Sequence, residues 1–326
     1  MDLILSTFGT ALTKDNDCFV VVTKEGKRRI APADVRSIQI HRGTQISSDA
    51  ALLAIEHEVE VLFVDKGGKP LGRVWSNSYG SISTIRKGQL EFTQSTAAVR
   101  WIIGEIAFKI ENQQALLSTF ASADEELRPT TDRAVLRLEA YHQKVKALTG
   151  DLVADVAPQL RGWEGMVSKI YFEQMNAFLP ERYRFGERTQ HPAMDVVNAL
   201  LNYGYGMMYG KVEGALIRAG IDPYIGVLHR DEYNRPVLVY DVIERYRVWV
   251  DYVVWTLVRQ CVIGEEYYSL QPDGSCWLEG LGRRVLIQSL NDYLAEVISI
   301  GRLERSRLTH IDLYAQALAQ KFKSNS

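Results

Sequence analysis

The sequence predicts an α+β protein in which a mostly β N-terminal domain is followed by a larger all-α catalytic domain. Up to about residue 65, the apolar residues come in short runs rich in β-branched side chains, separated by charged turns. Beyond about residue 93, they recur at the spacing of amphipathic helices over long segments. We therefore place the two domains at residues 1–92 and 93–326.

Short apolar runs predict the strands of the first domain. Charged glycine turns at residues 24–27 and 66–69 indicate hairpins. One helix, over residues 49–58, interrupts the strands, because Ser47 or Ser48 can cap it. The predicted strands are residues 3–5, 19–22, 35–40, 59–64, 71–75 and 89–92.

Two helices open the second domain. Pro129 separates them, because proline interrupts a continuing helix. Their apolar stripes comprise Val99, Ile102, Ile103, Ile106 and Ile110, then Leu136, Leu138, Val145 and Leu148.

A later apolar helix runs through residues 195–218. Asn198 and Asn202 lie four residues apart on it, so we expect this polar line to hold neighbouring loops. Small residues on the same helix would let another backbone come close; they are Ala199, Gly206 and Gly210.

Composition excludes several classes of protein. The net charge is −2 and the pI is about 6.3, which argues against a protein whose whole surface binds nucleic acid. A local basic track is compatible with these values. Cys18, Cys261 and Cys276 match no zinc or redox spacing, so we expect a reducing, cytoplasmic setting. No basic leader or segment of membrane-spanning length is present, so we expect no membrane.

The stretch from Gly220 to Arg247 carries candidate chemistry. If a helix begins at Asp241, its carboxylate and that of Glu244 share one face of the first turn. With His229 nearby, two carboxylates and an imidazole would suit Mg²⁺ or Mn²⁺. The alternative is structural: the two acids resemble a capping box, and His229 is then an ordinary loop histidine.

A third acid, Glu164, lies between Trp163 and Gly165. A bulky aromatic on one side and a glycine on the other make a carboxylate that is partly buried yet approachable. The alternative is a surface glutamate without a special role.

Together with their flanks, these residues resemble the CRISPR adaptation integrase family, the larger and catalytic CRISPR-associated adaptation endonuclease. The similarity rests on four blocks that occur in the family's order over the middle third of the chain. They are Glu164-Gly165 followed by Tyr171-Phe172, then DVVNALLNYGY at 195–205, AGIDPYIGVLH at 219–229, and Arg235-Pro236 leading into DVIERYR at 241–247.

The resemblance implies a metal site and its ligands. In this family a glutamate, a histidine and an acid from these blocks bind a divalent metal, and by position they are Glu164, His229 and Glu244. Asp241 corresponds to an extra family acid, and which of Asp241 and Glu244 coordinates directly stays open. His229 has to be neutral to bind metal, so activity is expected to fall below its pKa, roughly 6.5 if unperturbed.

The resemblance also implies the reaction. Short foreign DNA fragments, the spacers, are joined through their 3′-hydroxyl ends to a CRISPR repeat by two transesterifications. A water in place of the hydroxyl would give endonuclease cleavage. Two joins require two active sites and hence a homodimer, and the family adds a smaller ferredoxin-like CRISPR adaptation protein as partner. We expect Arg245, Arg247 and Arg259 to lie near the double-stranded DNA.

Two other interpretations make different predictions. A general metal-dependent nuclease acting on branched DNA would cleave without preferring a repeat or a partner. A non-catalytic architectural DNA-binding protein would be indifferent to metal, and His229→Ala would change nothing.

Overall fold

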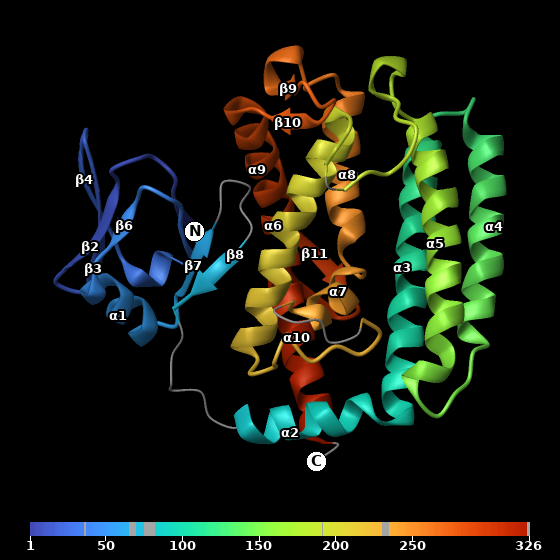
Figure 1. Cartoon of the computed structure of the whole chain (residues 1–326), viewed down its shortest axis with the longest axis horizontal. Helices are drawn as coiled ribbons and strands as arrows, with labels where there is room; N and C mark the ends of the chain where they lie inside the picture. The colour runs from blue at the N-terminus through green and yellow to red at the C-terminus, as the bar shows by residue number, and fades with distance from the viewer. Residues whose placement is uncertain (36, 65–69, 75–81, 191, 230–234, 325–326) are drawn as a thin grey trace. The chain divides into compact units, whose positions relative to one another are not determined.

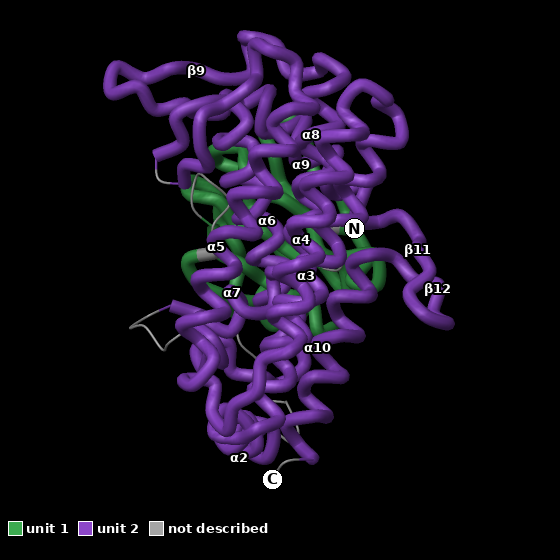
Figure 2. Tube along the Cα trace, turned by 90° about the vertical axis from the view of Figure 1, so that its right-hand side faces the viewer, with its two compact units in different colours: residues 1–80 green, residues 81–326 purple. Residues whose placement is uncertain are grey.

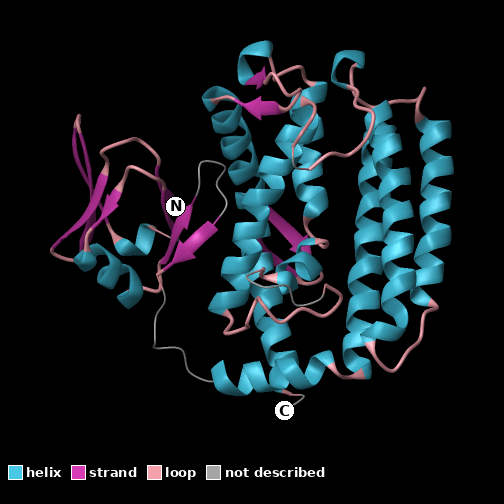
Figure 3. Ribbon diagram, viewed as in Figure 1, coloured by secondary structure: helices cyan, strands magenta, loops and turns pink. Residues whose placement is uncertain are grey.

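A computed structural model describes residues 1–35, 37–64, 70–74, 82–190, 192–229 and 235–324 of the chain. The chain separates into two compact units, residues 1–80 and 81–326 (Figure 2). Strands dominate the first unit and helices the second, which confirms the predicted fold class (Figure 3).

In its described residues, the first unit contains two four-stranded sheets and one α-helix. One sheet has the strand order β1-β5-β7-β8, with parallel pairing except between β7 and β8, and the other has the order β4-β3-β2-β6. The elements are β1 (Asp2–Leu5), β2 (Ala11–Asp15), β3 (Cys18–Thr23), β4 (Gly26–Ile30), the 3₁₀ turn η1 (Pro32–Asp34), β5 (Ser37–Ile40), β6 (Gln45–Ile46), α1 (Ser48–Glu56), β7 (Glu60–Val64) and β8 (Pro70–Arg73).

The local signals of this unit are largely confirmed. Thr23 pairs with Gly26 across the predicted hairpin turn of residues 24–27, whereas the turn predicted at 66–69 lies outside the described residues. Ser47 caps α1, because its Oγ accepts a hydrogen bond from the Ala50 N–H at 3.2 Å. The polar strand β4, of sequence GKRRI, carries no apolar run, and the sequence pattern therefore missed it.

The second unit begins with a helix that the sequence analysis placed differently. Residues 89–92 were predicted as a strand closing the first domain, but they lie in α2 (Ile82–Thr93), which packs against the C-terminal helix α10 (Arg307–Lys323). Ile85 and Phe92 face this core, and Gln89 is buried between them. The seven-residue spacing of the two apolar residues is that of a helix face.

Seven further helices, two short 3₁₀ turns and two hairpins follow in the described part of the unit. α3, α4 and α5 stand side by side, and α6 packs against α7, α8 and α10 (Figure 1). The elements are α3 (Thr96–Ser122), α4 (Arg128–Lys146), α5 (Val153–Ala177), η2 (Glu181–Tyr183), α6 (Val196–Arg218), α7 (Val237–Ile243), α8 (Arg247–Arg259), η3 (Glu265–Tyr267), β9 (Tyr268–Leu270), β10 (Cys276–Leu278), α9 (Gly280–Ala295), β11 (Val297–Ile300) and β12 (Leu303–Ser306).

The predicted break between the first two long helices is confirmed. Pro129 lies in the first turn of α4, where proline costs no internal hydrogen bond. Leu138 and Val145 are buried as expected, but Leu136 is 68% exposed and so does not belong to the core stripe. In the part of the chain that the structure describes, no helix is both long and apolar enough to cross a membrane.

Helix α6 runs through the core of the unit and makes one very close approach to α8. A Cβ added at Gly204 would lie 2.5 Å from Cγ1 of Val250, whereas one added at Gly206 would meet no heavy atom within 4 Å. The close approach expected of the small residues on this helix is therefore made at Gly204 and not at Gly206.

We expect Gly204→Ala to lower the free energy of unfolding by about 1–3 kcal/mol, because the added methyl overpacks the contact with Val250. Gly206→Ala is the matched control on the same helix, and it should be neutral or stabilise by about 0.5–1 kcal/mol through helix propensity. Urea denaturation of both variants measures the difference. Equal stability of the two would contradict the role assigned to Gly204.

Candidate active site

The segment expected to open a helix at Asp241 is arranged differently. Helix α7 already begins at Val237, directly after Pro236, and its apolar residues pack into the core. Asp241 consequently lies in the last turn of α7, and Glu244 is its C-cap residue. A second helix, α8, begins at Arg247, so the corner between the two helices carries Glu244.

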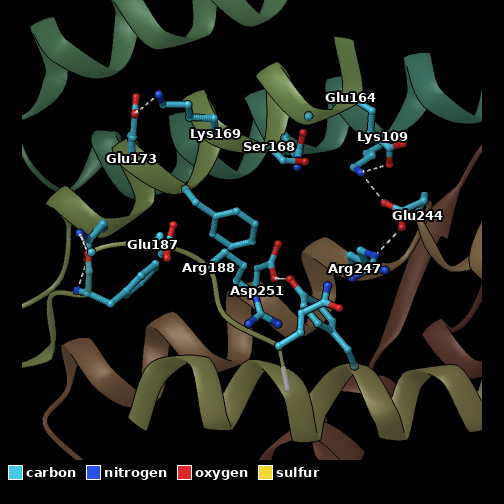
Figure 4. A pocket seen from close by; sticks show the side chains of 18 residues that line it. Lys109, Glu164, Ser168, Lys169, Glu173, Glu187, Arg188, Glu244, Arg247 and Asp251 are labelled. Atoms are coloured by element: carbon cyan, nitrogen blue, oxygen red, sulfur yellow. Dashed lines mark hydrogen bonds and ion pairs between the residues drawn. The ribbon is translucent and has the colours of Figure 1, made fainter. Parts of the chain in front are cut away.

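Lys109 links two of the predicted site residues. Its Nζ lies 2.6 Å from Oε1 of Glu164 on α5 and 2.5 Å from Oε2 of Glu244 (Figure 4). All three side chains are buried or nearly so, with 6% of Lys109, 19% of Glu164 and 6% of Glu244 exposed. The fold thus brings together two acids from distant parts of the sequence around one ammonium group.

The other oxygen of Glu244 also contacts a cation. The Nε–H of Arg247 donates to Oε1 of Glu244 at 2.6 Å. Burial opposes ionisation, but Arg247 and Lys109 overcome it and lower the pKa of Glu244 to about 2. Burial likewise opposes the charge of Lys109, yet Glu164 and Glu244 raise its pKa. The site therefore holds ionised side chains at neutral pH.

Asp241 holds the loop that carries His229. One carboxylate oxygen, Oδ2, accepts the backbone N–H groups of Val227 at 2.7 Å and Leu228 at 3.1 Å. The other, Oδ1, accepts the His229 N–H at 3.1 Å and contacts the ring Nδ1 at 2.7 Å. The Asp241 side chain is fully buried, and both of its oxygens are used in fixing this loop.

Two further contacts position the loop. Arg161 on α5 donates from Nη2 to the Leu228 carbonyl at 2.6 Å, which ties the loop to the helix that bears Glu164. Gly226 is required because an added Cβ would lie 2.3 Å from the His229 carbonyl oxygen. Nε2 of His229 has no hydrogen-bond partner among the described residues, and the side chain is 40% exposed.

The electrostatics of His229 follow from this arrangement. Burial lowers its pKa, but the hydrogen bond and charge of Asp241, together with the charges of Glu164 and Glu244, outweigh burial and raise it above its ordinary value. All three carboxylates therefore act on the same imidazole.

Glu164 and Glu244 line one end of a cavity of about 670 Å³ (Figure 4). Its wall mixes acidic, basic and aromatic side chains. The charged lining residues are Lys109, Lys169, Arg188 and Arg247 with Glu164, Glu173, Glu187, Glu244 and Asp251.

A polar network supports the back of the cavity. Tyr171 and Tyr205 donate to Asp251 at 2.8 and 2.5 Å. Burial raises the pKa of Asp251 to about 6, although both hydrogen bonds oppose this. Both Arg188 and Arg247 lie over the Tyr205 ring, at 5.5 and 4.7 Å from its centroid.

The expected role of the two asparagines on α6 is confirmed. Arg188 donates to Oδ1 of Asn198 at 2.7 Å and to Oδ1 of Asn202 at 2.5 Å. Asn198 also donates to the Glu187 carbonyl at 3.0 Å. Asn198 and Asn202 thus hold in place the loop that brings Glu187 and Arg188 to the cavity.

The three arginines expected near DNA lie in different surroundings. Arg247 lines the cavity. Arg245 pairs with Glu105 through two hydrogen bonds of 2.9 and 3.0 Å. Arg259 lies over the rings of Phe120 and Phe178.

Sequence reasoning missed Lys109, Arg188 and Asp251. A signal for Lys109 was present, because Glu105, Lys109 and Gln113 lie four residues apart beside the apolar stripe of α3, and all three are buried. A polar line beside an apolar stripe indicates buried partners elsewhere in the fold.

The chemistry of the donor set suits a hard divalent ion. Within the described residues, no group of three or more His, Cys, Asp or Glu side chains is close enough together to hold a metal ion as it stands. However, two carboxylates and an imidazole nitrogen are a suitable set for Mg²⁺ or Mn²⁺. The buried Oε2 of Glu244 has only the ion pair with Lys109 and no partner in hydrogen-bond geometry.

The chain belongs to a family of DNA-processing enzymes. The model of the family "CRISPR associated protein Cas1" matches residues 3–292, and the chain belongs to this family, the endonuclease and integrase family of CRISPR adaptation. The family resemblance inferred from the sequence is thereby confirmed.

Individual relatives agree with the family assignment. A CRISPR-associated endonuclease Cas1 of Archaeoglobus fulgidus is 31% identical over 90% of this chain and 88% of its own length. A longer protein in a Cas6-RT-Cas1–Cas2 complex matches with a TM-score of 0.78 and 22% identity. The match covers 99% of this chain and 35% of that protein. A casposase bound to integration product matches with a TM-score of 0.69 and 22% identity, over all of this chain and 96% of that one.

We expect Asp241→Asn to lower the pKa of His229, because the substitution removes the nearest charge that raises it. A raised histidine pKa stabilises the fold fully below the unfolded-state value of about 6.5, and this stabilisation is lost as pH rises through the folded-state value. The stability difference between wild type and variant should therefore be larger at pH 6 than at pH 8. A further, pH-independent loss of about 1–3 kcal/mol comes from the backbone donors left without their carboxylate.

NMR titration of the imidazole and denaturation at the two pH values measure these effects. Asp222→Asn is the control, because Asp222 accepts from a backbone N–H in the same loop, that of Tyr224. An unchanged His229 pKa in Asp241→Asn would refute the assigned contact.

Proposed function

We propose that this chain is a metal-dependent DNA integrase of CRISPR adaptation. It would join the 3′-hydroxyl ends of short foreign DNA fragments to the CRISPR repeat by transesterification. One observation carries the proposal. Glu164 and Glu244 converge on one buried ammonium at the end of a cavity, and their charges also act on His229.

We assign Glu164, His229 and Glu244 as the ligands of Mg²⁺ or Mn²⁺, with Asp241 as the residue that positions His229. Asp241 is the less suitable ligand because both of its oxygens already accept backbone and ring hydrogen bonds. When bound, such an ion polarises a phosphodiester oxygen and stabilises charge on the attacking and leaving oxygens.

The chain's own residues prepare the site for this chemistry. The contact of Asp241 with Nδ1 favours the tautomer in which that nitrogen carries the proton, which leaves the Nε2 lone pair for a ligand. Arg247 keeps Glu244 ionised and turned toward the cavity. Of the three arginines expected near DNA, we propose Arg247 as the phosphate contact, because it lines the cavity.

Integration requires more than one copy of the site. Two joins on opposite strands need two active sites, so we propose a homodimer that works with the smaller ferredoxin-like adaptation protein and double-stranded DNA. The presence of Cas2 in the complex that contains a structural neighbour supports this partner. The casposase bound to integration product supports joining over simple cleavage.

We expect the wild-type protein, with Mn²⁺ or Mg²⁺ and the small partner, to join a short duplex with 3′-hydroxyl ends to a supercoiled plasmid at the boundary of a repeat. His229→Ala and Glu164→Gln should each reduce joining by more than about 100-fold, because each removes a proposed ligand. The matched control is Glu173→Gln, which changes an acid of the same cavity that pairs only weakly with Lys169, at 3.9 Å. Gel analysis of joined and nicked plasmid measures all four proteins.

The same assay distinguishes the alternatives. Metal-dependent nicking without joining would favour a nuclease that uses water. DNA binding by wild type and variants alike, with neither joining nor nicking, would favour an architectural role.

We also expect joining to require a higher metal-ion concentration on the acid side of neutrality. Protonated His229 cannot bind a metal ion, and its raised pKa moves this loss to higher pH than the ordinary value of about 6.5. As pH falls, the Mn²⁺ concentration for half-maximal joining should rise, with the maximal rate largely restored by excess Mn²⁺. A metal requirement that stays constant from pH 8 to pH 5.5 would contradict His229 as a ligand.

A further inference from the structure

Lys109 stands where it meets both acidic ligands of the proposed site. Its ammonium contacts Glu164 Oε1 and Glu244 Oε2 at 2.6 and 2.5 Å, and its side chain is 6% exposed. The Lys109 side chain extends from α3 and places its ammonium group at the end of the cavity that Glu164 and Glu244 line (Figure 4).

Both oxygens of Glu244 contact a cation, Lys109 on Oε2 and Arg247 on Oε1. A divalent ion bound by Glu244 has to approach one of these oxygens closely. Two cations at such a short distance repel one another strongly in a buried site. One of the two side chains therefore has to leave its oxygen when the metal binds.

Lys109 is the side chain better suited to leave. Arg247 makes a directed hydrogen bond to Oε1, and its guanidinium also lies over the Tyr205 ring, 4.7 Å from the centroid. Lys109 donates a hydrogen bond to Oε1 of Glu164, but its close contact with Oε2 of Glu244 lies outside ideal hydrogen-bond geometry. A lysine is also a point charge on a flexible stem, whereas arginine is planar and Arg247 lies over an aromatic ring.

We propose that Lys109 is an exchangeable counter-ion of the metal site, which holds Glu164 and Glu244 together without metal and is displaced when a divalent ion binds both. This inference rests on the proposed function, since it takes those two acids as metal ligands. Lys109 is thus a positioning residue: it keeps two mutually repelling carboxylates close, and it competes with the ion that replaces it.

The proposal predicts opposite effects of Lys109→Met on stability and on metal affinity. Without metal, the melting temperature should fall by roughly 5–15 °C, because two buried carboxylates lose their shared cation. Mn²⁺ should bind roughly tenfold more tightly than to wild type, because no ammonium has to be expelled. Saturating Mn²⁺ should then return most of the lost melting temperature.

The experiment uses the full chain without DNA and measures Mn²⁺ binding by calorimetry and melting with and without Mn²⁺. Lys169→Met is the matched control, since Lys169 lines the same cavity but is 69% exposed and pairs weakly with Glu173. Lys109→Gln repeats the test with a polar side chain if Lys109→Met does not fold without metal, and tighter Mn²⁺ binding is again expected. Glu164→Gln tests the metal site itself.

The outcomes distinguish the counter-ion role of Lys109 from the metal site itself. If wild type binds Mn²⁺ in a manner that Glu164→Gln abolishes, but the Lys109 variants bind it equally or more weakly, the counter-ion role is wrong and the metal site stands. If Glu164→Gln binds Mn²⁺ as wild type does, or wild type binds none, the proposed metal site fails and the counter-ion role fails with it.

Discussion

The second unit depends on the neutralisation of charges that its helices carry into the interior. Glu164, Lys109, Glu244 and Arg247 form one chain of alternating charge from α5 through α3 to the corner between α7 and α8. Removing one member would leave a buried charge uncompensated, which is among the most destabilising changes a fold can undergo. The site residues are therefore also structural residues, and they fix the relative positions of three helices.

Helix α3 provides a second such connection one turn away. Glu105 accepts two hydrogen bonds from Arg245 and one, at 2.7 Å, from Tyr314 of α10. Asn112, on the same helix, donates to the Arg245 carbonyl at 3.1 Å. Because Arg245 directly follows Glu244, these contacts hold the corner that presents Glu244, and the C-terminal helix is part of the support of the site. Arg245, one of the arginines expected near DNA, therefore has a structural role.

The sequence was informative wherever function depends on residues close together along the chain. Asp241 and Glu244 were both singled out, but their spacing of three residues fits the first turn of a helix as well as its end. The helix begins at Val237 because Val237 and its neighbours are buried, and a single sequence does not show this burial. Asp241 holds the His229 loop by accepting hydrogen bonds from backbone N–H groups. Every residue type except proline has such a group, so no sequence pattern marks this role.

Lys109 shows the limit more sharply. Its partners are 55 and 135 positions away, and nothing in their spacing connects them. Only the buried polar line on α3 pointed to it. The N-terminal strands illustrate the same rule from the other side: β3 has a strong apolar run and was predicted, whereas the polar β4 is held mainly by pairing with it and was not.

The charge balance of the cavity would connect the proposed metal site with DNA. Five carboxylates and four cationic side chains of the described residues line it, so this lining carries a small net negative charge at neutral pH. A phosphodiester entering such a site meets net repulsion at short range. A bound divalent ion would add two positive charges to a lining of five carboxylates and four cations, so the net charge would change from −1 to +1 and the same wall would attract phosphate. Metal and DNA would then bind cooperatively at this site without any change in the fold, since the ion supplies the charge that the DNA requires.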